Sequence, residues 1–262
     1  MASAADFLDQ MAQAGRYHFA TADAAREMGR SLPATRAALG RLANQGRIAQ
    51  PHRGFYVIVP PEYRELGCLP AAQFIPQLFD YLGESYYAAL LTAAELHGAA
   101  HQRPQRFQVM CATRRRPIQC GAVSVEFVLR TDVERTATVW KNTPRGVLRV
   151  ASREATALEL VGYADRCGGL DHVLAVLEEL GPECDGELLA TEAAKVPNSW
   201  SQRLGHMLDV LSVDDPVTAP LAAQVAECRP VFAALSRSKK RAGAPSDRRW
   251  RLVINVDLEP SS

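Results

Sequence analysis

The segment Met28–Pro61 reads MGRSLPATRAALGRLANQGRIAQPHRGFYVIVPP and contains no acidic residue. Five arginines are spaced along it, namely Arg30, Arg36, Arg41, Arg47 and Arg53. Ser31 is a good helix N-cap and Gly46 a good helix stop, so the sequence predicts a helix between them. The next residues, Arg47–Ile58, form two β-prone arms around a polar turn, which predicts a β-hairpin.

Two shorter helices are predicted before this segment. Ser3 and Asp6 have the spacing of a capping box, and the helix they begin ends at Gly15. Thr21 is expected to cap a second helix, which ends at Gly29. The inward side chains of the third helix are predicted to be Leu32, Ala38, Leu39 and Leu42. Three helices followed by a hairpin predict a winged helix-turn-helix over residues 1–62.

Such a domain can insert the exposed N-terminal half of its third helix into the major groove of DNA. Thr35 and Arg36 are the predicted base readers, and the small Ala34 would allow close approach of the helix. The remaining contacts are expected at phosphates or, from the hairpin tip, in the minor groove. The predicted DNA-binding residues are Ser31, Ala34, Thr35, Arg36, Arg41, Arg47, His52 and Arg53. The alternative is a winged helix that makes only protein contacts.

The charge of the chain is segregated along the sequence. The whole chain holds 30 Lys+Arg and 29 Asp+Glu, yet residues 154–192 contain ten acids and a single arginine. This asymmetry predicts one nucleic-acid face and a separate negative surface. A length of 262 residues with 47% hydrophobic composition allows several folded domains. Without a signal-like N-terminus or a membrane-length apolar run, a cytoplasmic protein with no membrane contact is expected, and its six scattered cysteines are expected to be reduced and mostly buried.

Residues 63–262 are predicted to form a mixed α/β domain, with a possible subdivision near 181. The fold class expected for the whole chain is therefore α+β. Helices are expected at 71–82 and 85–98, after Ser152, at 170–180 and around 200–211, and strands at 106–111, 122–130, 147–150 and 250–258.

A second group of basic residues lies around the first of these strands and in the connection to the second. It consists of Arg103, Arg106, Arg114, Arg115 and Arg116, of which the last three are consecutive on a predicted hairpin loop. This patch could contact phosphates, a protein partner or the nucleic-acid substrate of that partner, or it could be a solvated loop. The basic stretch 237–245 is expected to be a loop that adds sequence-independent DNA affinity.

Catalytic signatures are missing from the sequence. His97 and His101 have the i, i+4 spacing of zinc ligands, but Gly98 follows His97 where a zinc protease requires its glutamate. The phosphate-binding, dinucleotide-binding and serine-hydrolase motifs do not occur. We therefore expect no enzyme activity, no metal and no cofactor.

Several separated stretches resemble one known family. They are Arg53–Tyr63, Tyr86–Tyr87, Leu90–Ala94, Leu96–Ala99, Phe107–Val109, Asn142–Pro144 and Glu154–Val161. In this order they are similar to the AbiEi family, the antitoxins of AbiE-type abortive-infection toxin–antitoxin systems, across roughly residues 5–180. Beyond that point little resemblance is seen.

The resemblance implies an N-terminal winged helix that represses its own operon by binding inverted repeats in the promoter. It also implies a C-terminal domain that counteracts a nucleotidyltransferase-like toxin, directly or indirectly, in a type IV arrangement. Two alternatives remain open. One is an ordinary transcriptional regulator with a ligand-sensing domain, and the other is an antitoxin that sequesters its toxin through the acidic 154–192 region.

Overall fold

The computed structural model describes residues 3–99 and 104–260. The chain divides into two compact units. The first comprises Met1–Tyr86, Gln105–Thr131 and Trp140–Arg149, and the second comprises Tyr87–Pro104, Asp132–Val139 and Val150–Ser262. Helices and strands occur in both, so the expected α+β class is confirmed. No helix within the described ranges is both long and apolar enough to span a membrane.

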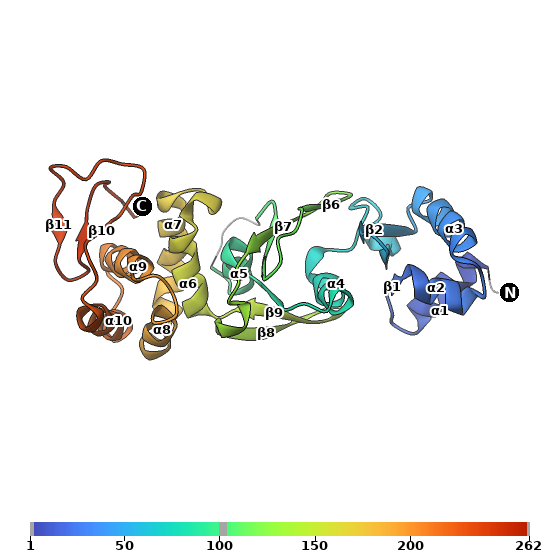
Figure 1. The fold of residues 1–262 in the computed structure, drawn as a ribbon, viewed down its shortest axis with the longest axis horizontal. Helices are drawn as coiled ribbons and strands as arrows, with labels where there is room; N and C mark the ends of the chain where they lie inside the picture. Colours follow the sequence, from blue (N-terminus) through green and yellow to red (C-terminus); the bar gives the residue numbers. More distant parts are fainter. Residues whose placement is uncertain (1–2, 100–103, 261–262) are drawn as a thin grey trace. The chain divides into compact units, whose positions relative to one another are not determined.

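The first unit begins with three helices and a three-stranded antiparallel sheet (Figure 1, blue). Their bounds are α1 Ala4–Gln13, β1 His18–Ala20, α2 Thr21–Met28, α3 Leu32–Asn44, β2 Ile48–His52 and β3 Phe55–Ile58. The sheet order is β1-β3-β2, with Phe19 opposite Tyr56 and Ala49 opposite Val57. Phe7 packs edge-on against Phe19, with 5.1 Å between ring centroids, so α1 and the sheet share one core.

Local capping explains where these helices begin and end. Ser3 and Asp6 form the expected capping box on α1, and the Ser31 hydroxyl accepts a hydrogen bond from the Ala34 amide at the start of α3. Gly29 ends α2 in the left-handed conformation at φ 62°, as predicted. Thr21 does not cap α2, because it is the first helical residue and its hydroxyl donates instead to the Gly54 carbonyl at 3.4 Å.

The orientation of α3 differs from the prediction at two positions. Its buried residues are Thr35, Ala38, Leu39 and Leu42, which have the i, i+3, i+4, i+7 spacing of one helical stripe. Thr35 is 0% exposed, so its predicted role as a base reader is wrong: the side chain faces the core. Leu32, predicted to face inward, is 45% exposed because the first turn of α3 is only partly covered.

The rest of the first unit is built around part of a six-stranded sheet of order β6-β7-β5-β4-β9-β8. The strands are β4 Tyr86–Ala88, β5 Phe107–Cys111, β6 Ile118–Cys120, β7 Val123–Leu129, β8 Thr138–Thr143 and β9 Gly146–Ala151. β5 pairs with β7 in parallel and β6 pairs with β7 antiparallel. The three consecutive arginines therefore lie on a connection between strands that do not pair with each other, not on a hairpin loop as predicted.

The helix predicted over residues 85–98 is shorter than expected. The segment begins as the buried strand β4 and becomes helix α5, Leu90–Leu96, only after a sharp turn at Leu90, where φ is 54°. Its tyrosines suit a strand: Tyr87 is fully buried, and Tyr86 stacks on Phe79 at 4.6 Å. The other helix of this region, α4, spans Ile75–Leu82 and ends at Gly83.

Two contacts within the first unit join the N-terminal elements to its later strands and helices. The Arg145 guanidinium lies 3.4 Å from the centroid of the Tyr17 ring, and its Nε donates to Gln73 Oε1 at 2.9 Å. Tyr81 of α4 lies 5.6 Å from the Phe55 ring of β3. Gly54 permits this approach: it adopts φ 80°, and a Cβ there would lie 2.9 Å from the Tyr81 hydroxyl.

The second unit is mainly helical (Figure 1, yellow to red). Besides α5 it contains α6 Arg153–Gly162, α7 Leu170–Leu180, α8 Gly186–Ala193, α9 Asn198–Val210 and α10 Asp215–Cys228, followed by a small sheet of β10 Ala233–Ala234, β11 Ser246–Asp247 and β12 Leu252–Val253. Ser152 caps α6 as expected. The strand expected over 250–258 is reduced to β12, because Arg251 adopts φ 50° before it and the chain after it follows no ladder.

Trp250 is the largest fully buried side chain of the second unit. Its Nε1 donates to Asp209 Oδ2 at 2.6 Å, and its ring lies against Gly205 of α9, where an added Cβ would come within 2.2 Å of the ring. A glycine inside a helix is thus required by close packing. All six cysteines are free and five are buried, as the sequence predicts.

We expect the substitution Gly205→Ala to lower the free energy of unfolding by about 1–3 kcal/mol, because the new methyl group overpacks against Trp250. Gly40 provides a matched control, since it also lies in a helix but a Cβ there would have nothing within 4 Å. Gly40→Ala should stabilise the chain by about 0.5–1 kcal/mol. Chemical denaturation followed by circular dichroism measures both, and wild-type stability in the Gly205 variant would contradict the packing argument.

Thr35 yields a second prediction, because its buried hydroxyl has no hydrogen-bond partner among the described residues. Thr35→Val keeps the shape of the side chain and removes the unsatisfied group, so stability should rise by up to about 1 kcal/mol. Thr35→Ser keeps the hydroxyl and loses a buried methyl group, so it should destabilise by about 1 kcal/mol. The reverse order of the two melting temperatures would show that the hydroxyl contributes to stability.

Candidate nucleic-acid interface

The exposed face of α3 is formed by small side chains and two arginines. Ala34, Ala37 and Gly40 are exposed, and Arg36 and Arg41 project from the same helix. With Thr35 buried, Arg36 is the polar side chain left in the N-terminal half of α3 after the capping Ser31. A guanidinium can donate two hydrogen bonds to a guanine edge, and small neighbours let the helix backbone approach closely. The surface of α3 can therefore enter a major groove.

Arg36 also influences the core beneath it. Burial raises the pKa of the Tyr56 hydroxyl, and the Arg36 charge acts in the opposite direction. Tyr56 stacks on Phe19 with 5.6 Å between ring centroids. Tyr56 therefore lies in the core close enough to α3 for the Arg36 charge to act on it.

The hairpin formed by β2 and β3 presents its tip beside α4. Arg53 is exposed at the turn, and the His52 ring donates from Nδ1 to the Arg53 carbonyl at 3.1 Å. The His52 ring also lies 6.3 Å from Tyr81. These contacts hold the backbone of the tip while leaving the Arg53 side chain exposed to solvent.

Arg47, predicted to contact phosphate, has a partner inside the protein. Its Nη2 lies 2.8 Å from Asp9 Oδ1 of α1, and its side chain is 33% exposed. An exposed ion pair of this kind contributes little to stability, so Arg47 can exchange Asp9 for another anion at small cost. Arg47 is therefore less available for contact with DNA than Arg36, Arg41 or Arg53.

A cleft of about 400 Å³ in the first unit brings the hairpin tip together with the second basic group. The hairpin contributes Pro51, His52 and Arg53, and the segment between β5 and β6 contributes Arg114, Arg115 and Arg116. The apolar part of the lining comes from Leu78, Leu82, Pro117, Ile118 and Phe127. Two basic segments more than sixty residues apart in sequence thus line one concave surface.

Within this cleft Arg115 differs from its two neighbours. Its Nη2 lies 2.7 Å from Glu84 Oε1, and its guanidinium is 5.7 Å from the Phe79 ring centroid. The hydrogen bond from Arg115 holds the pKa of the Glu84 carboxyl below its ordinary value. Arg115 therefore anchors the segment. Arg114 and Arg116 are exposed, and within residues 3–99 and 104–260 neither has an ion-pair partner.

The other two members of the predicted basic patch are not part of the cleft lining. Arg106 is exposed just before β5 and has an interaction of its own. Arg103 lies outside the described residues. No group of three His, Cys, Asp or Glu side chains that could hold a metal ion occurs in the ranges that the structure describes.

The acidic region 154–192 is less negative at its surface than its sequence indicates. Glu154, Glu159 and Glu192 are 6%, 1% and 6% exposed, respectively. Glu159 accepts a hydrogen bond from the Tyr87 hydroxyl at 2.6 Å, and Glu154 accepts one from the Asp185 amide at 3.2 Å. Three of the ten acidic side chains are thus buried in the core. This weakens the expectation that the whole 154–192 region forms a negative docking face.

Sequence reasoning missed the residues that assemble the cleft. Tyr81 is 46% exposed and packs against the hairpin, and Leu78 and Phe127 line the cleft between its basic walls. Their own neighbours in sequence carry no sign of this role. The acid-free stretches 28–61 and 96–125 are the one available signal, since two such stretches in one chain are candidates for a shared surface.

Comparison with solved structures shows where this fold has been seen. The crystal structure of the RV2827C protein from Mycobacterium tuberculosis superposes with a TM-score of 0.67 at 18% identity, covering 95% of this chain and 90% of that chain. At this identity the likeness is one of fold. An antigenic nucleotidyltransferase-like protein from Paracoccidioides brasiliensis gives a TM-score of 0.40 at 12% identity, covering 58% and 91%, which is too distant to support any inference.

Comparison with curated proteins finds no match. Residues 87–210 match the family model of the AbiEi antitoxin C-terminal domain. That range begins in β4 and ends with α9, so it includes the buried helix α6 whose sequence contributed to the resemblance. Residues 87–210 are therefore similar in sequence to the AbiEi antitoxin C-terminal domain, and this match confirms the resemblance seen in the sequence.

Proposed function

We propose that this chain is an AbiEi-family antitoxin and also a DNA-binding autorepressor. In this proposal residues 1–62 are a winged helix-turn-helix that binds inverted repeats in the promoter of its own operon. The remainder, residues 63–262, counteracts a nucleotidyltransferase-like toxin. The observation that carries the DNA-binding proposal is the exposed basic surface of the first unit, formed by α3, the hairpin tip and the cleft beside it.

The element order of residues 4–58 supports the winged-helix assignment. Three helices precede an antiparallel hairpin, and the third helix begins after a tight turn at Gly29 and exposes a face of small side chains. In DNA-binding domains of this type the corresponding helix enters the major groove. Arg36 is then the base reader, and Arg41 and Arg53 are phosphate or minor-groove contacts.

The cleft extends the proposed interface beyond the N-terminal domain. Arg114 and Arg116 are exposed beside Arg53, so a duplex that contacts the hairpin would have phosphates within reach of both segments. Arg115 serves to hold the segment in place through Glu84. We therefore assign Arg114 and Arg116 to sequence-independent affinity.

Operator binding tests the assignment of Arg36. In a gel-shift titration on the promoter of the chain's own operon, Arg36→Ala should lose about 1–3 kcal/mol of binding free energy and relax base preference at one position of each repeat. Thr35→Val is the matched control one residue away and should bind like wild type, because Thr35 is buried. Unchanged base preference in Arg36→Ala would remove Arg36 as a reader, and full promoter binding after deletion of residues 1–60 would refute the DNA-binding proposal.

The contribution of the cleft can be separated by salt dependence. Each phosphate contact adds about −0.9 to the slope of log affinity against log salt concentration. Arg116→Ala should therefore reduce the magnitude of that slope by about one unit and weaken all sequences equally. Arg64→Ala is the matched control, since Arg64 is exposed in the same unit but does not line the cleft. Equal slopes for both variants would exclude the cleft from the interface.

A further inference from the structure

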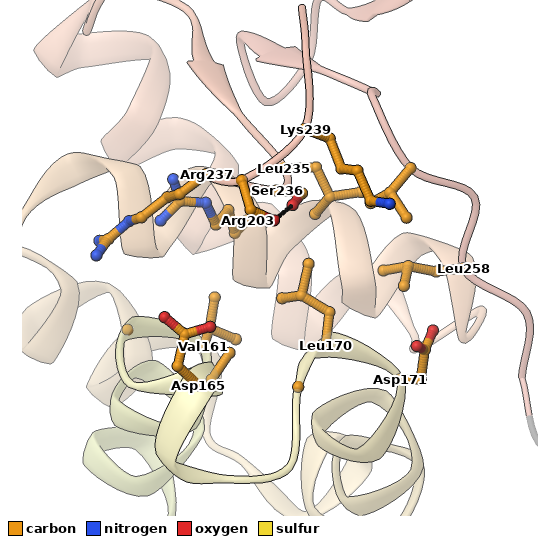
Figure 2. Close-up of a pocket in the computed structure, with 15 residues that line it drawn as sticks. Val161, Asp165, Leu170, Asp171, Arg203, Leu235, Ser236, Arg237, Lys239 and Leu258 are labelled. Carbon is orange, nitrogen blue, oxygen red and sulfur yellow. Dashed lines mark hydrogen bonds between the residues drawn. The ribbon is translucent and has the colours of Figure 1, made fainter.

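A second cavity, of about 260 Å³, lies entirely within the second unit (Figure 2). One wall comes from the end of α6 and the start of α7, and the other from α9 and the chain that follows β10. The first wall presents Asp165 and Asp171, and the second presents Arg203, Arg237 and Lys239. Figure 2 shows the two sets facing each other across the opening. The proposed DNA-binding surface does not include this cavity.

Arg203 is the central feature of the basic wall. The residue is 5% exposed, and its Nε donates to the Ala234 carbonyl at 2.8 Å. The terminal nitrogens of this guanidinium have no hydrogen-bond or ion-pair partner among the residues that the structure describes. These nitrogens are not fully buried and lie at the cavity, where a guanidinium can bind an anion from solution.

The surroundings of Arg203 increase its positive potential. The pKa of Arg203 is lowered to about 10, mainly by burial and in addition by the charges of Arg237 and Arg241. Asp165 and Asp171 form no ion pair with these cations in residues 3–99 and 104–260. The three cations of the wall therefore remain available to a ligand.

The loop that carries two of these cations is fixed before any ligand binds. Asn255 Oδ1 accepts from the Ser236 amide, and its Nδ2 donates to the carbonyls of Ser236 and Lys239, all at 2.9 Å. The hydroxyls of Ser236 and Ser238 are 3.1 Å apart beside the cations, the contact drawn as a dashed line in Figure 2. Arginine, lysine and serine hydroxyls held in one place form a preorganised site for a phosphate group.

We propose that this cavity binds a small phosphorylated sugar, with the phosphate at Arg203, Arg237 and Lys239 and the sugar hydroxyls donating to Asp165 and Asp171. The carboxylates on the opposite wall only accept hydrogen bonds, so they suit hydroxyl donors and disfavour a second anionic group. The volume is slightly below the range of about 300–1,000 Å³ that encloses drug-sized ligands. It holds a phosphate and a pentose, whereas a base attached to the sugar would remain in solvent.

Calorimetric titration of the full chain tests the proposal, with inorganic phosphate and ribose 5-phosphate as probes. Ribose 5-phosphate should bind more tightly than phosphate, and Arg237→Ala should weaken both probes about tenfold. Asp165→Asn should weaken ribose 5-phosphate and leave phosphate unchanged. Arg248→Ala is the matched control, because it removes an exposed arginine from the same C-terminal segment outside the cavity. Melting curves verify that each variant is folded.

Two further titrations make the outcome decisive. Adenosine 5′-monophosphate should bind as tightly as ribose 5-phosphate, because its base would remain in solvent. Tighter binding of the nucleotide would overturn a sugar phosphate as the ligand. The proposal is overturned if phosphate and ribose 5-phosphate bind equally, or if Arg248→Ala costs as much as Arg237→Ala. It is also overturned if duplex DNA displaces ribose 5-phosphate, because the cations would then belong to a nucleic-acid surface.

Discussion

The contact of Arg145 with Tyr17 fixes the part of the molecule on which the proposed DNA surface depends. The guanidinium lies 3.4 Å from the ring centroid, is 15% exposed, and also bonds Gln73 and approaches Glu62 at 3.6 Å. A cation on an aromatic face that is largely removed from water is worth up to about 2 kcal/mol. The packing of Tyr81 on Phe55 provides a second connection. Together with the direct packing of β2 on β6, they hold the hairpin beside the Arg114–Arg116 segment.

Helices whose ends are set by capping residues close in sequence could be predicted. The capping box at Ser3, the glycine stop at Gly29 and the cap at Ser152 all lie within a few residues of the structure they cause. The 85–98 segment was different, since its apolar residues fit a helix or a buried strand equally well. A turn at the buried Leu90 separates the two, and hydrophobic periodicity does not report its positive φ.

The basic residues of the proposed DNA-binding surface could be predicted from the sequence, but the directions in which the side chains of α3 point could not. Arginines could be counted, yet the facing of Thr35 and Leu32 depended on which stripe of α3 packed against the core, and the two alternatives differ by a small rotation. The partners of Arg47 and Arg115 are Asp9 and Glu84, which lie more than thirty residues away in sequence. Pairing over such distances follows from the fold, as does the cavity around Arg203.

The burial of Thr35 limits how much sequence information α3 could carry. One guanidinium distinguishes a base pair by about 1–3 kcal/mol. A genome offers about a million or more competing sites, and outweighing a million of them requires about 8 kcal/mol of preference. If Arg36 is the principal base reader, a single copy of the chain cannot select one site in a genome. Recognition would then reside in the spacing of two half-sites, and shifting one repeat by half a helical turn would erase it although the bases of each half-site are unchanged.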